Sequence, residues 1–227
     1  MFLLVDPDKC SHEHTQAMRF ARETNDPDVE ALAYSGLARV GFLQGEILSG
    51  AAHTRHCIDI ARRQGLDSLV YGHLHMVGLG LQHELRLEEA LTWMTDAAQN
   101  AFQTGAPRQA VISNYFCAEV LYDLGRYSDC REYAERSKQL AIQTTELRYL
   151  PGAQSILAKL DAMLGEVAEF EDFLRRRWES MTVTERRFSG PLVLGALAIV
   201  TDDIALSDWA LQQGKMLRQG PSMRQFL

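Results

Sequence analysis

The chain has 227 residues, of which 46% are hydrophobic and 23% are charged, and its formal net charge is −7. This composition is typical of a folded protein, and the acidic balance provides no basic field that would hold a nucleic-acid backbone directly. No apolar run approaches the roughly 20 residues that span a bilayer, and the start of the chain lacks the basic flank of a secretory signal. The four cysteines form no CxxC pair, so neither a zinc ribbon nor a disulfide framework is indicated. We therefore expect a cytoplasmic protein that makes no contact with a membrane.

Hinge-like and small residues recur every forty positions along the chain. The hinge series is Gly45, Leu85, Gly125, Gly165 and Ala205. Seven positions before each hinge the chain carries a small residue, namely Ala38, Gly78, Ala118, Ala158 and Ala198. Five positions after each hinge it carries a small or apolar residue, namely Gly50, Ala90, Cys130, Phe170 and Ala210. Self-similarity at a fixed period predicts a stacked array of repeats.

Between the hinges, apolar residues are spaced three and four apart, as they are on a helix, and the alternation typical of strands is absent. Asp26 is the expected N-cap before Pro27, and Pro107, Pro151 and Pro191 are expected near the starts of later helices. The predicted fold is all-α, a single domain over 1–227. It begins with a leftover helix at 8–24. Five helix–turn–helix repeats follow near 27–64, 67–104, 107–143, 147–180 and 188–219, with internal turns expected at 43–46, 84–87, 124–127, 164–166 and 202–204.

This arrangement resembles the tetratricopeptide repeat, and the resemblance covers nearly the whole chain. The stretch "CAEVLYDLGRYSDCREYAERS" is the best match, and "GLARVGFLQGEILSGAAHTRHC" is the next. The chain departs from the classical unit because its period is 40 rather than 34 residues and because the early Trp and the closing Pro are missing. The resemblance implies an α-solenoid that coils as a right-handed superhelix.

Longer units of this kind resemble the C-terminal repeat regions of bacterial LuxR/MalT-type activators and of nucleotide-cyclase-linked signalling regulators. The segment "GALAIVTDDIALSDWALQQGKML" is similar to the final repeats of the cyclase-linked group. No phosphate-binding GxxxxGK[ST] motif occurs in the chain. The expectation is therefore a fragment or a stand-alone relative of such regulators, with open apolar solenoid ends that predict a homodimer.

The family resemblance also implies that a partner binds on the concave face, which the first helices of the repeats line. Of the positions expected to be exposed there, eight carry the predicted binding residues. Aromatic and arginine side chains are the usual anchors of protein-recognition surfaces. The predicted partner-binding residues are Arg39, Phe42, His75, Gln82, Tyr115, Glu119, Tyr122 and Lys159.

Several other residues attract attention but have ordinary structural explanations. His53, His56 and Cys57 lie at i, i+3 and i+4 and would suit zinc, but no fourth ligand is visible locally and Cys57 occupies a helix-packing position. The other cysteines also fall on packing positions. The basic run 175–177 spreads around a helix, which is typical of a solvated face. We therefore predict no metal site, no cofactor and no catalytic residue.

The sequence is compatible with three functional hypotheses. The leading hypothesis is a non-catalytic scaffold or regulatory module of a bacterial signalling or transcription regulator, which binds a protein or peptide. The alternative is a sensor that holds a metabolite or nucleotide effector inside the superhelix, near Tyr115, Tyr122 and His83. The third is an enzyme that holds a metal at the His53, His56 and Cys57 set. The sequence leaves the identity of the partner or ligand and the oligomeric state open.

Overall fold

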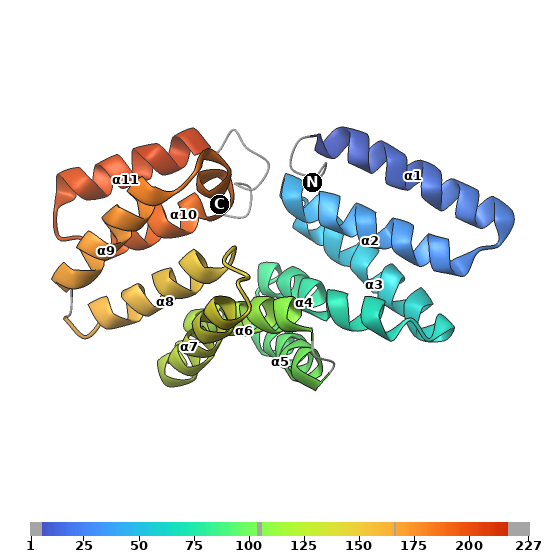
Figure 1. Ribbon diagram of the computed structural model, residues 1–227, viewed down its shortest axis with the longest axis horizontal. Helices are drawn as coiled ribbons and strands as arrows, with labels where there is room; N and C mark the ends of the chain where they lie inside the picture. The colour runs from blue at the N-terminus through green and yellow to red at the C-terminus, as the bar shows by residue number, and fades with distance from the viewer. Residues whose placement is uncertain (1–5, 104–105, 166, 218–227) are drawn as a thin grey trace. The chain divides into compact units, whose positions relative to one another are not determined.

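The computed structural model describes residues 6–103, 106–165 and 167–217, and within these ranges the chain is all-α with eleven helices (Figure 1). The helices are α1 (Pro7–Thr24), α2 (Pro27–Gln44), α3 (Ile47–Gln64), α4 (Asp67–His83), α5 (Leu87–Gln103), α6 (Pro107–Asp123), α7 (Tyr127–Gln143), α8 (Leu150–Ala162), α9 (Val167–Ser180), α10 (Val183–Val200) and α11 (Ile204–Leu217). The expectation of an all-helical chain is confirmed. The expected repeat ends at 104 and 219 lie outside the described residues.

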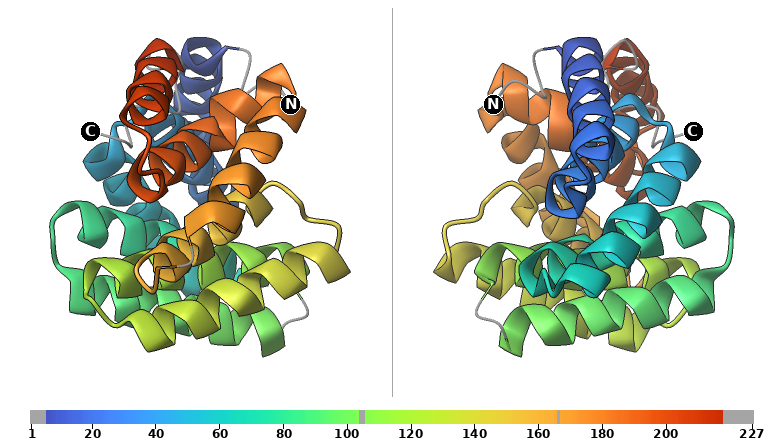
Figure 2. Two further views of the ribbon diagram at one scale, coloured as in Figure 1. Left: turned by 90° about the vertical axis from the view of Figure 1, so that its left-hand side faces the viewer. Right: turned by 90° about the vertical axis from the view of Figure 1, so that its right-hand side faces the viewer.

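The helices gather in two compact units, Met1–Thr104 and Gly105–Leu227, which divide between α5 and α6. In the first unit each of α1 to α4 packs against the next helix in the sequence. In the second unit α6 to α11 also pack in sequence, and α8 additionally contacts α6 and α10. Figure 2 shows these consecutive helices from two further directions. Sequential antiparallel packing is consistent with a helical repeat, while the single domain over 1–227 stays a prediction.

Most helix ends share one backbone motif, which explains the hinge series. Residues with positive φ close the helices at Asn25, Gly45, Gly65, Leu85, Gly125, Thr145 and Gly165, and neighbouring members differ by 20 or 40 positions. At Leu85 the amide N–H donates to the carbonyl of Gln82, and the next amide, that of Arg86, donates to the carbonyl of Leu81. Such left-handed closures satisfy carbonyls that the helix leaves unpaired at its C-terminus.

The N-terminal ends of the helices use proline and side-chain caps. The carboxylate of Asp26 accepts a hydrogen bond from the amide of Val29 at 3.1 Å, which confirms the predicted cap. Pro27, Pro107 and Pro151 all stand within the first two positions of a helix. A proline costs little there because its missing N–H would have no partner in the helix.

The last helices depart from the predicted boundaries. Helix α10 begins at Val183 rather than at 188, because Thr182 and Glu185 form a capping box five residues earlier than expected. Pro191 consequently lies inside α10 rather than at its start. The expected hinge at Ala205 is wrong, because Ala205 lies in the first turn of α11 and α10 ends at Val200. Helix α8 is also shorter than predicted and starts at Leu150.

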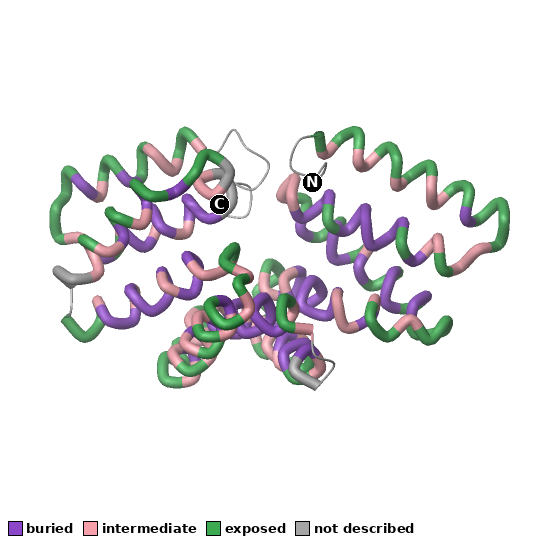
Figure 3. Tube along the Cα trace, in the orientation of Figure 1, coloured by how far each residue is buried: buried purple, intermediate pink, exposed green. Residues whose placement is uncertain are grey.

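The small residues that the repeat pattern places between hinges lie at helix contacts. Ala38, Ala118, Ala158 and Cys130 are buried, whereas Ala198 is half-buried. A Cβ on Gly41 would lie 3.0 Å from the Cα of Gly50, so α2 and α3 approach backbone to backbone. Helix α6 carries ten buried residues and α7 carries four (Figure 3). No helix in the described part of the chain is long and apolar enough to cross a membrane.

Replacing Leu85 with glycine should raise the free energy of unfolding by about 1 kcal/mol, because glycine adopts a left-handed conformation without the steric cost of a Cβ. Leu85 has a φ of 59° and is 82% exposed, so the substitution sacrifices little packing. Leu32, which is 56% exposed inside α2, provides the control. Leu32→Gly should lower the free energy of unfolding by about 1 kcal/mol through helix propensity alone. Chemical denaturation measures both, and destabilisation by both would contradict the assignment of strain to Leu85.

Candidate functional site

The candidate site lies in the second unit, where four of the eight predicted residues come together. Tyr115, Glu119 and Tyr122 occupy positions i, i+4 and i+7 of α6, so they share one helix face. Lys159 belongs to α8, which packs against α6, and its Nζ lies 4.3 Å from the ring centroid of Tyr122. The hydroxyl of Tyr115 donates a hydrogen bond to Oε1 of Glu119. We call these four residues the Tyr–Glu–Lys row.

Aromatic packing holds the buried end of the row. The ring of Tyr115 is only 3% exposed and lies with its centroid 5.7 Å from that of Tyr149 and 4.9 Å from that of Phe116. A Cβ on Gly152 would lie 2.6 Å from Cε2 of Tyr115, so the first turn of α8 has room for this ring only because residue 152 is glycine. The buried ring fixes the hydroxyl that orients the carboxylate of Glu119.

Burial also controls the charges of the row. Burial raises the pKa of Glu119 to about 7, and the charge of Asp123 adds to this effect, while the hydroxyl of Tyr115 and the ammonium of Lys159 oppose it. Burial lowers the pKa of Lys159, whereas the negative charges of Glu119 and Asp123 raise it. Burial and the adjacent Glu119 carboxylate raise the pKa of Tyr115 well above its ordinary value. The carboxyl group of Glu119 therefore titrates near neutral pH, beside an ammonium that rests on an aromatic ring.

This arrangement is suited to recognition of a polar or charged group. Glu119, Tyr122 and Lys159 are half-buried, so each keeps part of its surface accessible. The ammonium of Lys159 donates hydrogen bonds, and the carboxyl of Glu119 donates or accepts them according to its protonation. A partly desolvated charge attracts a ligand more strongly than a fully hydrated one, because less water screens it.

The other four predicted residues belong to the first unit and do not join the row. Arg39 is exposed and Gln82 is half-buried, whereas Phe42 and His75 are buried. The expectation that Phe42, His75 and Tyr115 are exposed is therefore wrong. The ring of Phe42 fills the space above Gly50, where a Cβ would approach it to 2.9 Å, and His75 lies on α4, which α3 and α5 both cover.

The sequence analysis missed a buried hydrogen-bonded pair between α2 and α4. The hydroxyl of Ser35 lies 2.7 Å from Nε2 of His73, and Nδ1 of His73 lies 2.8 Å from the carbonyl oxygen of Leu69. A carbonyl only accepts, so Nδ1 carries the proton and Nε2 accepts from Ser35. Burial lowers the pKa of His73 to about 4, which keeps the ring neutral. Ser35 and His73 are 6% and 2% exposed, so the pair joins the two helices rather than facing a substrate.

The residues named for the metal-enzyme and sensor hypotheses were also located in the structure. The rings of His56 and His53 lie 5.1 Å and 5.8 Å from that of Tyr34, and burial raises the pKa of the Cys57 thiol to about 11. The described residues contain no group of three His, Cys, Asp or Glu side chains placed to hold a metal ion. The set named for a small-molecule sensor is divided, because His83 belongs to the first unit and Tyr115 and Tyr122 to the second.

The arginines of the run 175–177 pair with nearby carboxylates. Arg175 lies 4.0 Å from Glu171, Arg177 lies 3.2 Å from Glu185, and Arg176 pairs with Asp172. The run is thus neutralised locally, as expected of a solvated face.

Comparison with known proteins assigns the chain to no family. No protein-family model matches the chain, and no curated protein is significantly similar to it. The resemblance to tetratricopeptide repeats consequently rests on the sequence pattern, and the sequential helix packing is consistent with a helical repeat in general.

Replacing Glu119 with glutamine should change how stability depends on pH. The pKa of Glu119 is higher in the folded protein than in the unfolded chain, so its contribution is fully present below about pH 4.5 and is lost as the pH rises through about 7. Between those values the free energy of unfolding of the wild type should fall by roughly 2–3 kcal/mol relative to Glu119→Gln. Urea titrations at several pH values measure the difference.

Glu132→Gln is the control, because Glu132 is exposed on α7. That variant should follow the wild type across the same range. Parallel curves for Glu119→Gln and the wild type would contradict a half-buried Glu119 that titrates near pH 7.

Proposed function

We propose that the chain is a tetratricopeptide-like α-solenoid with a forty-residue period and a right-handed superhelix. In this proposal it acts as a non-catalytic scaffold or regulatory module of a bacterial signalling or transcription regulator. It binds a protein or peptide on the face that the first helices of its repeats form. The spacing of the left-handed helix ends, at 25, 45, 65, 85, 125, 145 and 165, supports the period.

The Tyr–Glu–Lys row is the observation that carries the binding proposal. It places an aromatic ring, an ammonium and a titrating carboxyl next to one another on α6 and α8. Tyrosine is among the residues that contribute most to protein–protein binding, because it buries a large area and still offers a hydroxyl. The row combines such an anchor with charges that are already partly desolvated. The free-energy cost of desolvating these charges on partner binding is therefore lower.

The double substitution Tyr122→Ala/Lys159→Ala should reduce partner binding at least about tenfold, as the loss of hot-spot side chains does. The measurement is quantitative capture of proteins from a lysate of the source cells on the immobilised chain. Recovery of a specific partner should fall with the double variant.

Tyr133→Ala/Lys138→Ala removes the same residue types from α7, where both are half-buried, and should leave recovery unchanged. Circular dichroism and thermal unfolding check that both variants keep the fold. Equal recovery by the wild type and the Tyr122/Lys159 variant would refute the proposed surface. A saturable rise in melting temperature with a metabolite or nucleotide, lost in that variant, would favour the sensor alternative.

A further inference from the structure

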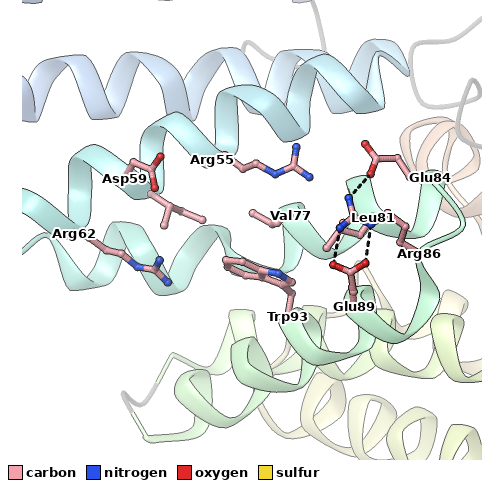
Figure 4. A pocket seen from close by; sticks show the side chains of 10 residues that line it. Arg55, Asp59, Arg62, Val77, Leu81, Glu84, Arg86, Glu89 and Trp93 are labelled. Atoms are coloured by element: carbon pink, nitrogen blue, oxygen red, sulfur yellow. Dashed lines mark hydrogen bonds and ion pairs between the residues drawn. The ribbon is translucent and has the colours of Figure 1, made fainter.

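The first unit contains a groove that none of the predicted binding residues lines. It encloses about 470 Å³ between α3, α4 and α5. Arg55, Asp59 and Arg62 form its α3 side, and Val77 and Leu81 of α4 lie at its floor. The indole of Trp93 points into it from α5 (Figure 4). The groove thus combines an apolar strip and an aromatic ring with a charged edge.

The two sides of the groove differ in how their charges are satisfied. Arg86, on the side opposite α3, lies 3.3 Å from Glu84 and 2.6 Å from Glu89 and is neutralised by them. Among the described residues, neither Arg55 nor Arg62 has an ion-pair partner within 4 Å, and Asp59 between them has none either. All three side chains are exposed. The α3 side therefore presents a positive, a negative and a positive charge that no other described group of the chain satisfies.

The spacing of these three charges along α3 indicates what kind of ligand could pair with them. Positions 55, 59 and 62 are i, i+4 and i+7 of α3, so the side chains share a face and the arginines are about 10.5 Å apart along the axis. A partner that extends along α3 matches this separation of the two positions better than a single small anion does. A second helix lying along α3 would bring its own side chains past all three at the same intervals.

We propose that this groove binds an amphipathic helix of another protein, which carries acidic, basic and acidic side chains at helical spacing beside an apolar stripe. The acidic residues pair with Arg55 and Arg62, and the basic residue pairs with Asp59. The apolar stripe contacts Trp93 and the strip of α4, which is the usual way a helix occupies a groove. This site lies in the first unit and is independent of the Tyr–Glu–Lys row in the second.

Two labelled synthetic helices test the proposal against the full chain. The first carries Glu, Lys and Glu at i, i+4 and i+7 along a leucine stripe, and the second carries Lys, Glu and Lys at the same positions. Fluorescence anisotropy should show saturable binding of the first helix and at least about tenfold weaker binding of the second, since like charges then oppose each other. Added salt should weaken the first complex.

Charge reversal of the groove separates this site from general attraction. Arg55→Glu/Arg62→Glu should bind the first helix at least about tenfold more weakly and should gain affinity for the second. Arg19→Glu/Arg63→Glu makes the same change in net charge at exposed positions outside the groove and should behave as the wild type. Trp93→Ala should weaken binding of the first helix without reversing the charge preference.

Four results would count against the proposal. One is no saturable binding of either helix up to about 100 µM, and another is equal affinity of the wild type for both. The third is unchanged affinity of the Arg55/Arg62 variant for the first helix, with circular dichroism confirming that this variant is folded. Binding that is lost equally in the Arg19/Arg63 control would also count against the groove, because it would reflect net charge alone.

Discussion

Close contact between neighbouring helices is the constraint on which the rest of the structure depends. At Gly41 and Gly50 the backbones of α2 and α3 are separated by little more than a van der Waals contact. Helix α4 approaches both α3 and α5 closely. A Cβ on Gly80 would lie 2.3 Å from the Cβ of Ala51 in α3, and a Cβ on Gly78 would lie 3.2 Å from the carbonyl oxygen of Ala90 in α5. Such packing leaves no room for larger side chains, so the small residues of the repeat pattern are required by geometry.

The same constraint determines which side chains remain for binding. A first helix that is covered on two sides buries most of its residues, and only a narrow strip can carry accessible polar groups. On α6 that strip holds Glu119 and Tyr122, and the neighbouring α8 contributes Lys159. Helix α3 exposes a row of charges at its edge, where Arg55 and Arg62 lie. The two candidate surfaces thus belong to different units of the chain.

Much of the fold was predictable because its determinants are local. Hinge glycines, the Asp26 cap and helical spacing act over a few residues, and they placed most helices near their observed positions. The predicted helix boundaries in the C-terminal part were wrong because the capping box at Thr182 starts α10 earlier than the forty-residue pattern requires. For the site, helical spacing correctly aligned Tyr115 with Glu119 and Tyr122, but it could not show that Tyr115 is buried. The contact of Ser35 with His73 joins residues 38 apart on different helices, and no pattern within one helix reveals it.

The most direct test of the packing constraint is the same substitution at two helical glycines, with unfolding free energies measured by denaturant titration. Gly41→Leu should lower the free energy of unfolding by at least about 2 kcal/mol, because the new side chain would meet the backbone of α3. Gly214→Leu should raise it slightly, because nothing lies within 4 Å of the added Cβ and leucine favours a helix over glycine. Equal effects at the two positions, or a gain in stability at Gly41, would contradict the central claim.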